Sequence, residues 1–197
     1  MFANRYTAVL DACVLVPALQ RNILLSLADA SFYRLRWSER ILDETEQALI
    51  KVIGQHIGDD VQVRARAAQA VIGMKDAFAD AAVHGYERLE VAIEELPDPN
   101  DRHVVAAALM TKAQVIVTDN LRDFPEAVLA GYEIEVASSQ QFIHQIVDLD
   151  PRRAVSAIET MRARLRRPEL TWETLLTKMD LAGLGRAADA LAAARWG

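Results

Sequence analysis

The segment YTAVLDACVLVPAL (residues 6–19) places an acidic residue directly behind an apolar run. Its first part, Tyr6–Leu10, predicts a buried β-strand, because short apolar, β-branched runs are typical of strands inside a sheet. Asp11 follows at once, and a carboxylate among buried apolar groups is costly unless it is paired or binds a ligand. A residue that merely ends the strand in a turn would also explain Asp11.

Further apolar runs alternate with helical patterns along the chain. The clearest is QVIVT (residues 114–118), which predicts a strand because it is short and β-branched. Strands are also expected at residues 89–93 and 133–137. A helix is expected to open at Trp37 and Ser38, with Ser38 as its N-cap. The alternation predicts an α/β fold with a mainly parallel sheet.

The sequence changes character after about residue 145. Asp150 and Pro151 are expected to start a helix that Pro168 ends, and no β-branched run follows. We therefore expect residues 1–147 to form the α/β domain and residues 148–197 to form a helical C-terminal extension.

The composition, the net charge and the single cysteine indicate which broad class of protein the chain belongs to. The 197 residues are 52% hydrophobic, which is enough for a full core, and the net charge is −6. Such a charge does not indicate nucleic-acid or membrane binding as a whole, although a local basic patch could still serve. The single cysteine excludes an intrachain disulfide and suits a reducing compartment. No signal-peptide layout or membrane-spanning run occurs, so a soluble cytoplasmic protein is expected.

Carboxylates follow two of the expected strands. Asp11 follows the first strand, and Asp119 follows the strand at residues 114–118. Because open α/β sheets bind ligands beyond the C-terminal ends of their strands, both side chains should project from one edge. Glu44 and Asp101 lie on inward faces of two expected helices, where an acid needs a partner or a ligand. Four carboxylates that are distant in sequence could therefore converge.

Clustered carboxylates without histidine are typical of Mg²⁺ and Mn²⁺ sites, because these ions prefer oxygen ligands. Such ions orient and deprotonate a water molecule that hydrolyses a phosphodiester. Each acid also has a simpler explanation. Asp11 and Asp119 could end strands in turns. Glu44 could pair with Arg40, and Asp101 could stabilise a helix N-terminus.

The other reactive side chains indicate no second site. Cys13 is expected to be a small buried side chain, since no histidine is placed to activate it as a nucleophile. The histidines show no spacing typical of metal ligands and are expected to be surface or satisfied residues; they are His56, His84, His103 and His144.

Four segments of the chain resemble the PIN-domain family, and in particular the VapC-type ribonuclease toxins of bacterial toxin–antitoxin pairs. They are AVLDACVLV (8–16), RWSERILDE (36–44), PDPNDRHVVAAAL (97–109) and VIVTDNLRDFP (115–125). The resemblance implies an α/β/α sandwich with a parallel sheet and an endoribonuclease site that depends on Mg²⁺ or Mn²⁺. It also implies frequent homodimers and a small antitoxin protein that inserts into the cleft.

The resemblance also implies roles for individual residues. Asp11, Glu44 and Asp101 match the first three acids of the family. Both Asp119 and Asp123 could match the fourth, and the position at the strand end favours Asp119. Polar positions that support the site are matched by Thr118 and Asn120, whereas Cys13 stands where the family often has Asn or Ser. This departure predicts a weaker hydrogen bond beside the metal site.

An acidic site repels RNA unless cations lie elsewhere on the protein. Residues 151–167 contain six arginines and one acid, Glu159, which gives a local charge of six minus one, or +5. Arginine suits phosphate contacts, but a solvated helix face is an equally good interpretation. The candidates for RNA contact are Arg152, Arg153, Arg162, Arg164, Arg166 and Arg167.

The predicted function is a metal-dependent endoribonuclease, the toxin of a type II toxin–antitoxin pair. The alternative is a catalytically impaired PIN-like module that binds RNA or a partner. A metal-dependent phosphatase of another α/β fold is a weaker alternative, because Asp11-Ala12-Cys13 lacks the second acid of the Asp-x-Asp motif.

Overall fold

The computed structural model describes residues 6–93, 96–165 and 170–196. The strands are β1 (Thr7–Leu10), β2 (Arg34–Ser38), β3 (Ala82–Val83), β4 (Val115–Val117) and β5 (Glu135–Ala137). They form one parallel sheet in the order β3-β2-β1-β4-β5. This sheet confirms the predicted α/β class.

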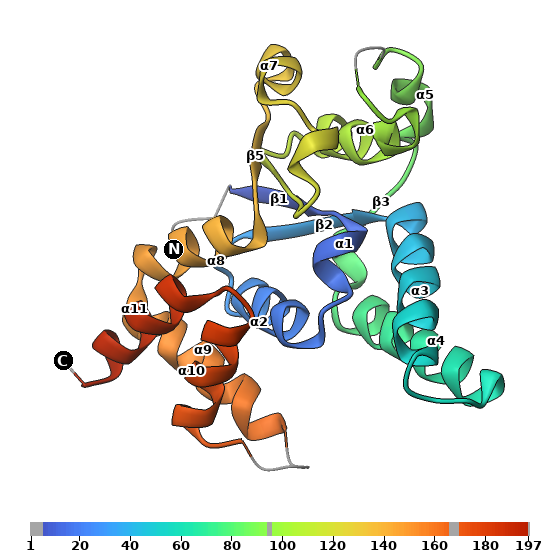
Figure 1. The fold of residues 1–197 in the computed structure, drawn as a ribbon. Coiled ribbons are helices and arrows are strands. Elements are labelled where there is room, and N and C mark those ends of the chain that lie inside the picture. Colours follow the sequence, from blue (N-terminus) through green and yellow to red (C-terminus); the bar gives the residue numbers. More distant parts are fainter. Residues whose placement is uncertain (1–5, 94–95, 166–169, 197) are drawn as a thin grey trace.

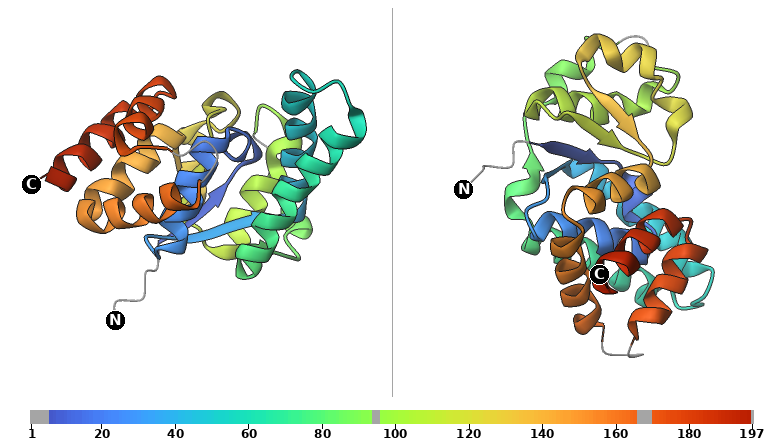
Figure 2. Two further views of the ribbon diagram at one scale, coloured as in Figure 1. Left: turned by 90° about the horizontal axis from the view of Figure 1, so that it is seen from below. Right: turned by 90° about the vertical axis from the view of Figure 1, so that its left-hand side faces the viewer.

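Helices cover both faces of the sheet (Figures 1 and 2). Helix α6 (Arg102–Thr111) packs on one face, and α2 (Ala18–Asp29) and α8 (Ser139–Leu149) pack on the opposite face. The expected sandwich is therefore present. The other α-helices are α1 (Ala12–Leu15), α3 (Glu39–Gly54), α4 (Asp60–Ala77), α5 (Glu87–Glu90), α7 (Glu126–Leu129), α9 (Pro151–Arg164), α10 (Trp172–Leu181) and α11 (Gly185–Trp196). Short 3-10 turns are η1 (Ala79–Ala81), η2 (Pro99–Asp101), η3 (Leu121–Asp123) and η4 (Ala130–Tyr132).

The two central strands bring distant parts of the chain to one edge. All residues of β1 and β4 are buried, as expected for strands covered on both faces. In their parallel register Leu10 pairs with Val117, and the Asp11 N–H donates to the Val117 carbonyl at 3.0 Å. The residues that follow the two strands, Asp11 and Thr118, therefore lie side by side at the same edge of the sheet.

Two local expectations differ from the structure. β2 is absent from the prediction because Trp37 and Ser38 indicate a helix start, whereas the helix begins at Glu39 with Ser38 as its N-cap. The strand expected at residues 89–93 is wrong. Residues Glu87–Glu90 are helical, and Leu89 of this short helix packs against the core.

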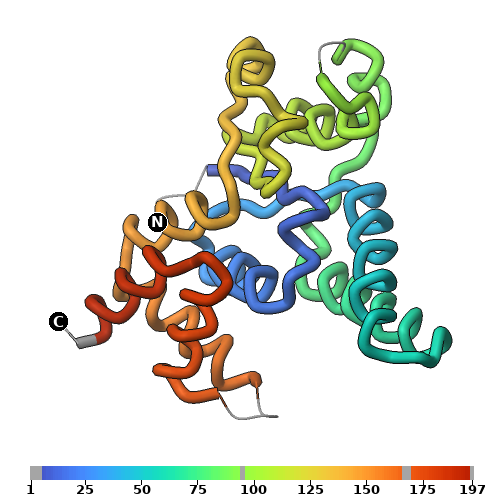
Figure 3. The backbone as a smooth tube through the Cα atoms, in the orientation of Figure 1, coloured from blue at the N-terminus to red at the C-terminus, as the bar shows by residue number. Residues whose placement is uncertain are grey.

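The described C-terminal residues form the helices α9, α10 and α11, joined by short non-helical segments, and no strand lies among them, as expected. α9 packs on α2, and α11 packs on α8, α9 and α10. Figure 3 shows these late helices beside the early segment that contains α2. Among the described residues, no helix has the length and apolar character needed to cross a membrane.

Candidate metal centre

The carboxylate of Asp11, at the end of β1, accepts three hydrogen bonds. Its Oδ1 accepts the Ala12 N–H at 2.7 Å, and its Oδ2 accepts the Thr118 hydroxyl at 2.7 Å and the Cys13 thiol at 3.0 Å. The residue is 7% exposed. Asp11 thus caps α1, as a turn residue would, but it is also a buried carboxylate with a fixed orientation.

The Cys13 thiol is part of this network. Burial first, and then the charge of Asp11, raise the pKa of Cys13 to about 12, so the group stays protonated and can donate to Asp11. Its sulfur also accepts the Asp119 N–H at 3.2 Å. A thiol is a weak donor, so the hydrogen bond is present but of the weaker kind that the sequence predicts.

We expect Cys13→Ser to keep the orientation of Asp11 and Cys13→Val to lose it. A hydroxyl donates more strongly than a thiol, whereas valine leaves Asp11 Oδ2 with Thr118 as its remaining side-chain donor. Divalent-ion binding, measured by calorimetry, should be unchanged or tighter for serine and about tenfold weaker for valine. Equal binding by both variants would contradict a role for the thiol.

Asp101 lies among several acids. It ends η2 immediately before α6 and is half-buried. Burial first, and then the charges of Asp11, Asp98 and Asp123, raise the pKa of Asp101 to about 6. Each of these three acids is therefore close enough to Asp101 to disfavour its charged form, and a bound cation would relieve that repulsion.

This raised pKa predicts a pH-dependent stability. The folded-state pKa of Asp101 lies above its unfolded value of about 3.9, so its stabilising contribution is present at low pH and is lost as pH rises through about 6. In EDTA, Asp101→Asn should therefore unfold at a higher temperature than the wild type at pH 7.5. The difference should shrink toward pH 4.5. A variant destabilised equally at every pH would contradict this interpretation.

Glu44 is paired rather than free. Its Oε1 lies 3.3 Å from Arg40 Nε and 3.1 Å from His103 Nε2, and its side chain is 40% exposed. Burial acts to raise the pKa of Glu44, but His103 and Arg40 outweigh burial and hold it below its usual value. The pairing with Arg40 that the sequence offered as the simpler explanation is thus present.

His103 is the residue that sequence reasoning missed. It is fully buried, and its Nδ1 has no hydrogen-bond partner within the described part of the chain, so it is neither a surface residue nor a satisfied one. It faces Glu44 and also lowers the pKa of Asp101. The apolar residues that follow it in α6, Val104 and Val105, are the signal that could have indicated its burial.

Asp119 and Asp123 have different surroundings. Both oxygens of Asp119 are engaged, because Oδ1 accepts the Ser139 N–H at 2.9 Å and Oδ2 accepts Gln20 Nε2 at 3.0 Å. The Ser139 hydroxyl also donates to both oxygens. Asp123 instead accepts the Asn120 side-chain amide and acts on the pKa of Asp101, which Asp119 does not.

The carboxylates suit a hard divalent cation. No three His, Cys, Asp or Glu side chains in residues 6–93, 96–165 and 170–196 form a ready-made metal cage. Mg²⁺ does not need one, because it is usually bound by one or two carboxylates and keeps several waters. The acids that act on Asp101 supply that kind of ligand.

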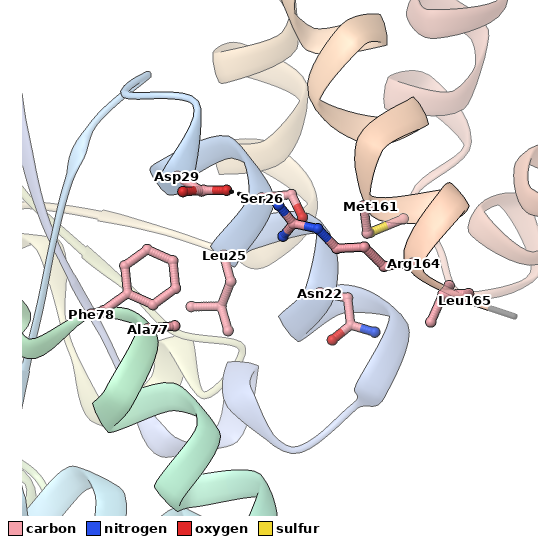
Figure 4. A pocket seen from close by; sticks show the side chains of 9 residues that line it. All are labelled: Asn22, Leu25, Ser26, Asp29, Ala77, Phe78, Met161, Arg164 and Leu165. Atoms are coloured by element: carbon pink, nitrogen blue, oxygen red, sulfur yellow. Dashed lines mark ion pairs between the residues drawn. The ribbon is translucent and has the colours of Figure 1, made fainter.

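Most described arginines of the basic segment make contacts within the chain. Arg153 stacks 4.5 Å from the Phe32 ring centroid, and Arg162 donates to Glu159 and to the Leu170 carbonyl. Arg164 pairs with Asp29 at 3.6 Å across a cavity of about 390 Å³ between α2, α4 and α9 (Figure 4). Arg152 is exposed and makes no such contact in the described structure. Arg166 and Arg167 lie outside the described residues.

Comparison with known proteins agrees with this fold. Residues 7–122 match the family model described as PIN domain, and residues 141–193 match the model described as VapC50 C-terminal domain. The chain therefore belongs to the PIN-domain family, which confirms the resemblance seen in the sequence.

A Mycobacterium tuberculosis (strain ATCC 25618 / H37Rv) protein named "Putative ribonuclease VapC50" is 39% identical over 77 residues. The match covers 39% of this chain and 42% of that protein's length. No solved structure matches the chain significantly.

Proposed function

We propose that this protein is a metal-dependent endoribonuclease that hydrolyses RNA phosphodiesters, and that it is the toxin of a type II toxin–antitoxin pair. The observation that carries the proposal is a group of carboxylates beside the ends of β1 and β4 in a PIN-domain chain, where Asp11 and Asp123 both lie close enough to act on Asp101. The printed name of the mycobacterial relative, a ribonuclease, supports the choice of substrate.

Asp11, Asp101 and Asp123 would hold Mg²⁺ or Mn²⁺, with Glu44 joining directly or through water. When bound, the ion activates water and neutralises charge on the phosphate. The protein's own groups fix the ligands beforehand: Thr118 and Cys13 orient Asp11, and Asn120 orients Asp123. Asp119 enters this proposal as a structural residue, because Ser139 and Gln20 occupy its oxygens.

The wider assignments are also proposals. They comprise the division into residues 1–147 and 148–197, an RNA substrate, a small antitoxin partner, a homodimer and a cytoplasmic location. The boundary at residue 147 falls within α8, which ends at Leu149. Of the arginines proposed for RNA contact, Arg152 is the strongest candidate, because it is exposed and its side chain makes no hydrogen bond or ion pair within the described structure.

The test is cleavage of a mixed RNA by the purified chain with Mg²⁺ or Mn²⁺, compared with EDTA. We expect cleavage with either ion and none in EDTA, since the acids need an ion to bring a phosphate near. Cleavage unaffected by EDTA would contradict the metal-dependent mechanism. Ion binding without cleavage of any RNA would favour the second candidate below.

The second candidate is a PIN-like module that binds RNA or a partner without cutting. The pairing of Glu44 with Arg40 and His103 favours it, because a neutralised acid is less available to an ion. The variant Arg40→Gln separates the two candidates. It should change cleavage less than tenfold if Glu44 is already available, and should restore cleavage if the pairing blocks the site.

A further inference from the structure

A cavity of about 460 Å³ lies between α8 and the first turn of α11. Its volume falls within the range of small-ligand sites. The lining is unusual, because it contains neither acidic nor apolar residues although the whole chain is acidic. The lining residues are Gln140, Gln141, His144, Gln145 and Arg186.

These side chains have unused hydrogen-bonding groups. Gln140, Gln145 and Arg186 make no side-chain hydrogen bond or ion pair with the described residues, and all three are exposed. Gln141 uses its Oε1 to accept from Ser138, which leaves its amide N–H groups. His144 Nδ1 is buried and has no partner within the described ranges, while its Nε2 lies 3.5 Å from Asp148. A ligand that both donates and accepts would satisfy this set.

The chemistry of the lining suits a nucleotide. Glutamine amides donate and accept in one plane, as the edge of a nucleobase does, and are used to recognise adenine in particular. A single arginine matches one phosphate group. Sequence-specific proteins recognise unpaired RNA bases by such contacts to base edges. A basic protein surface as partner would be repelled by Arg186 and would find no carboxylate in the lining.

The helix that lines the cavity, α8, is hydrogen-bonded to Asp119 through its first residue. Asp119 binds the backbone N–H of Ser139, the first residue of α8, and Gln140 is the next residue. Asp119 follows Thr118, whose hydroxyl binds Asp11 at 2.7 Å. With a rise of 1.5 Å per residue, Gln145 lies about 9 Å along α8 from Ser139. The lining of the cavity therefore begins one residue after the group that holds Asp119.

We propose that this cavity is a nucleotide subsite, in which the glutamines contact an unpaired base and Arg186 contacts a neighbouring phosphate of the RNA. The inference rests on the proposed function, since it needs RNA to be the substrate. It assigns to the C-terminal helices a role in choosing which RNA is cut.

The test uses the full chain carrying Asp11→Asn, so that RNA is bound but not cut. Fluorescence anisotropy with a single-stranded RNA that the wild type cleaves would measure affinity. We expect Gln140→Ala with Gln145→Ala, and separately Arg186→Ala, to weaken binding about tenfold. Matched controls are Gln69→Ala and Arg64→Ala, which change exposed residues of α4 that make no side-chain hydrogen bond or ion pair in the described structure. These should bind as tightly as the parent.

A second measurement does not depend on activity. The imidazole NMR signal of His144, identified by its loss in His144→Asn, should shift when the same RNA is added. At the same RNA concentration it should shift less in the variant that also carries Arg186→Ala. Unchanged affinity of the cavity variants, with RNA still bound, would overturn the inference and leave the proposed function standing. No RNA binding or cleavage by any form would overturn both.

Discussion

Asp11→Asn is expected to lower metal-dependent RNA cleavage by about 10²–10³-fold while leaving the fold intact. Asparagine keeps an Oδ1 that can accept the Ala12 N–H, so the cap of α1 survives. The substitution removes the negative charge that a cation needs. It also replaces Oδ2, which accepts hydrogen bonds from Thr118 and Cys13, with an amide group that donates. Cleavage rates in Mg²⁺ and thermal unfolding in EDTA would measure the two effects separately.

The control for this prediction is Asp76→Asn, which removes an equal charge from an exposed position of α4. It should cleave like the wild type. The Asp11 variant also has a signature that damage to the fold would not produce. Because the charge of Asp11 contributes to the raised pKa of Asp101, that pKa should fall below about 6 in Asp11→Asn. Undiminished cleavage by Asp11→Asn would exclude Asp11 as a ligand.

Asp119 and Asp123 should respond to substitution in opposite ways. Asp119→Ala removes the acceptor for Ser139 at the start of α8 and for Gln20, so we expect a loss of about 2 kcal/mol in the free energy of unfolding. Asp123→Asn removes one charge beside Asp101 and should cost little stability. It should nevertheless lower cleavage by about 10²-fold or more.

Urea unfolding and cleavage assays on the same preparations would test this contrast. Asp119→Asn, which can still accept a hydrogen bond from Ser139, is the matched variant and should keep most of the stability and the cleavage. The assignment would be reversed if Asp119→Asn abolished cleavage at full stability while Asp123→Asn remained active.

The fold was largely predictable because its central strands are unambiguous in sequence. The runs that became β1 and β4 are apolar and β-branched, which parallel strands covered on both faces require. β2 was not predictable in the same way. Arg34 and Arg36 alternate with Leu35 and Trp37, and the helix cap at Ser38 gave the stronger local signal.

The candidate site was predictable as a set of acids but not in its pairings. The position of Asp11 after a strand follows from sequence, whereas the Thr118 hydroxyl that fixes it lies 107 positions away. The choice between Asp119 and Asp123 depends on where Ser139 and Gln20 lie in space. His103 was missed because a histidine on a helix face has no spacing signal of its own, and its contact with Glu44 joins α6 to α3.

The hydrogen bonds from Ser139 to Asp119 make the conformation of this carboxylate depend on whether the chain extends as far as α8. A chain that stopped before α8 would lose the two groups of Ser139 that hold this carboxylate, leaving Gln20 as its side-chain donor. Asp119 could then rotate toward the other acids and change both the charge and the ion preference of the cleft. Studying a fragment limited to residues 7–122, the part that matches the PIN-domain model, would therefore examine a different candidate site from the one in the whole chain.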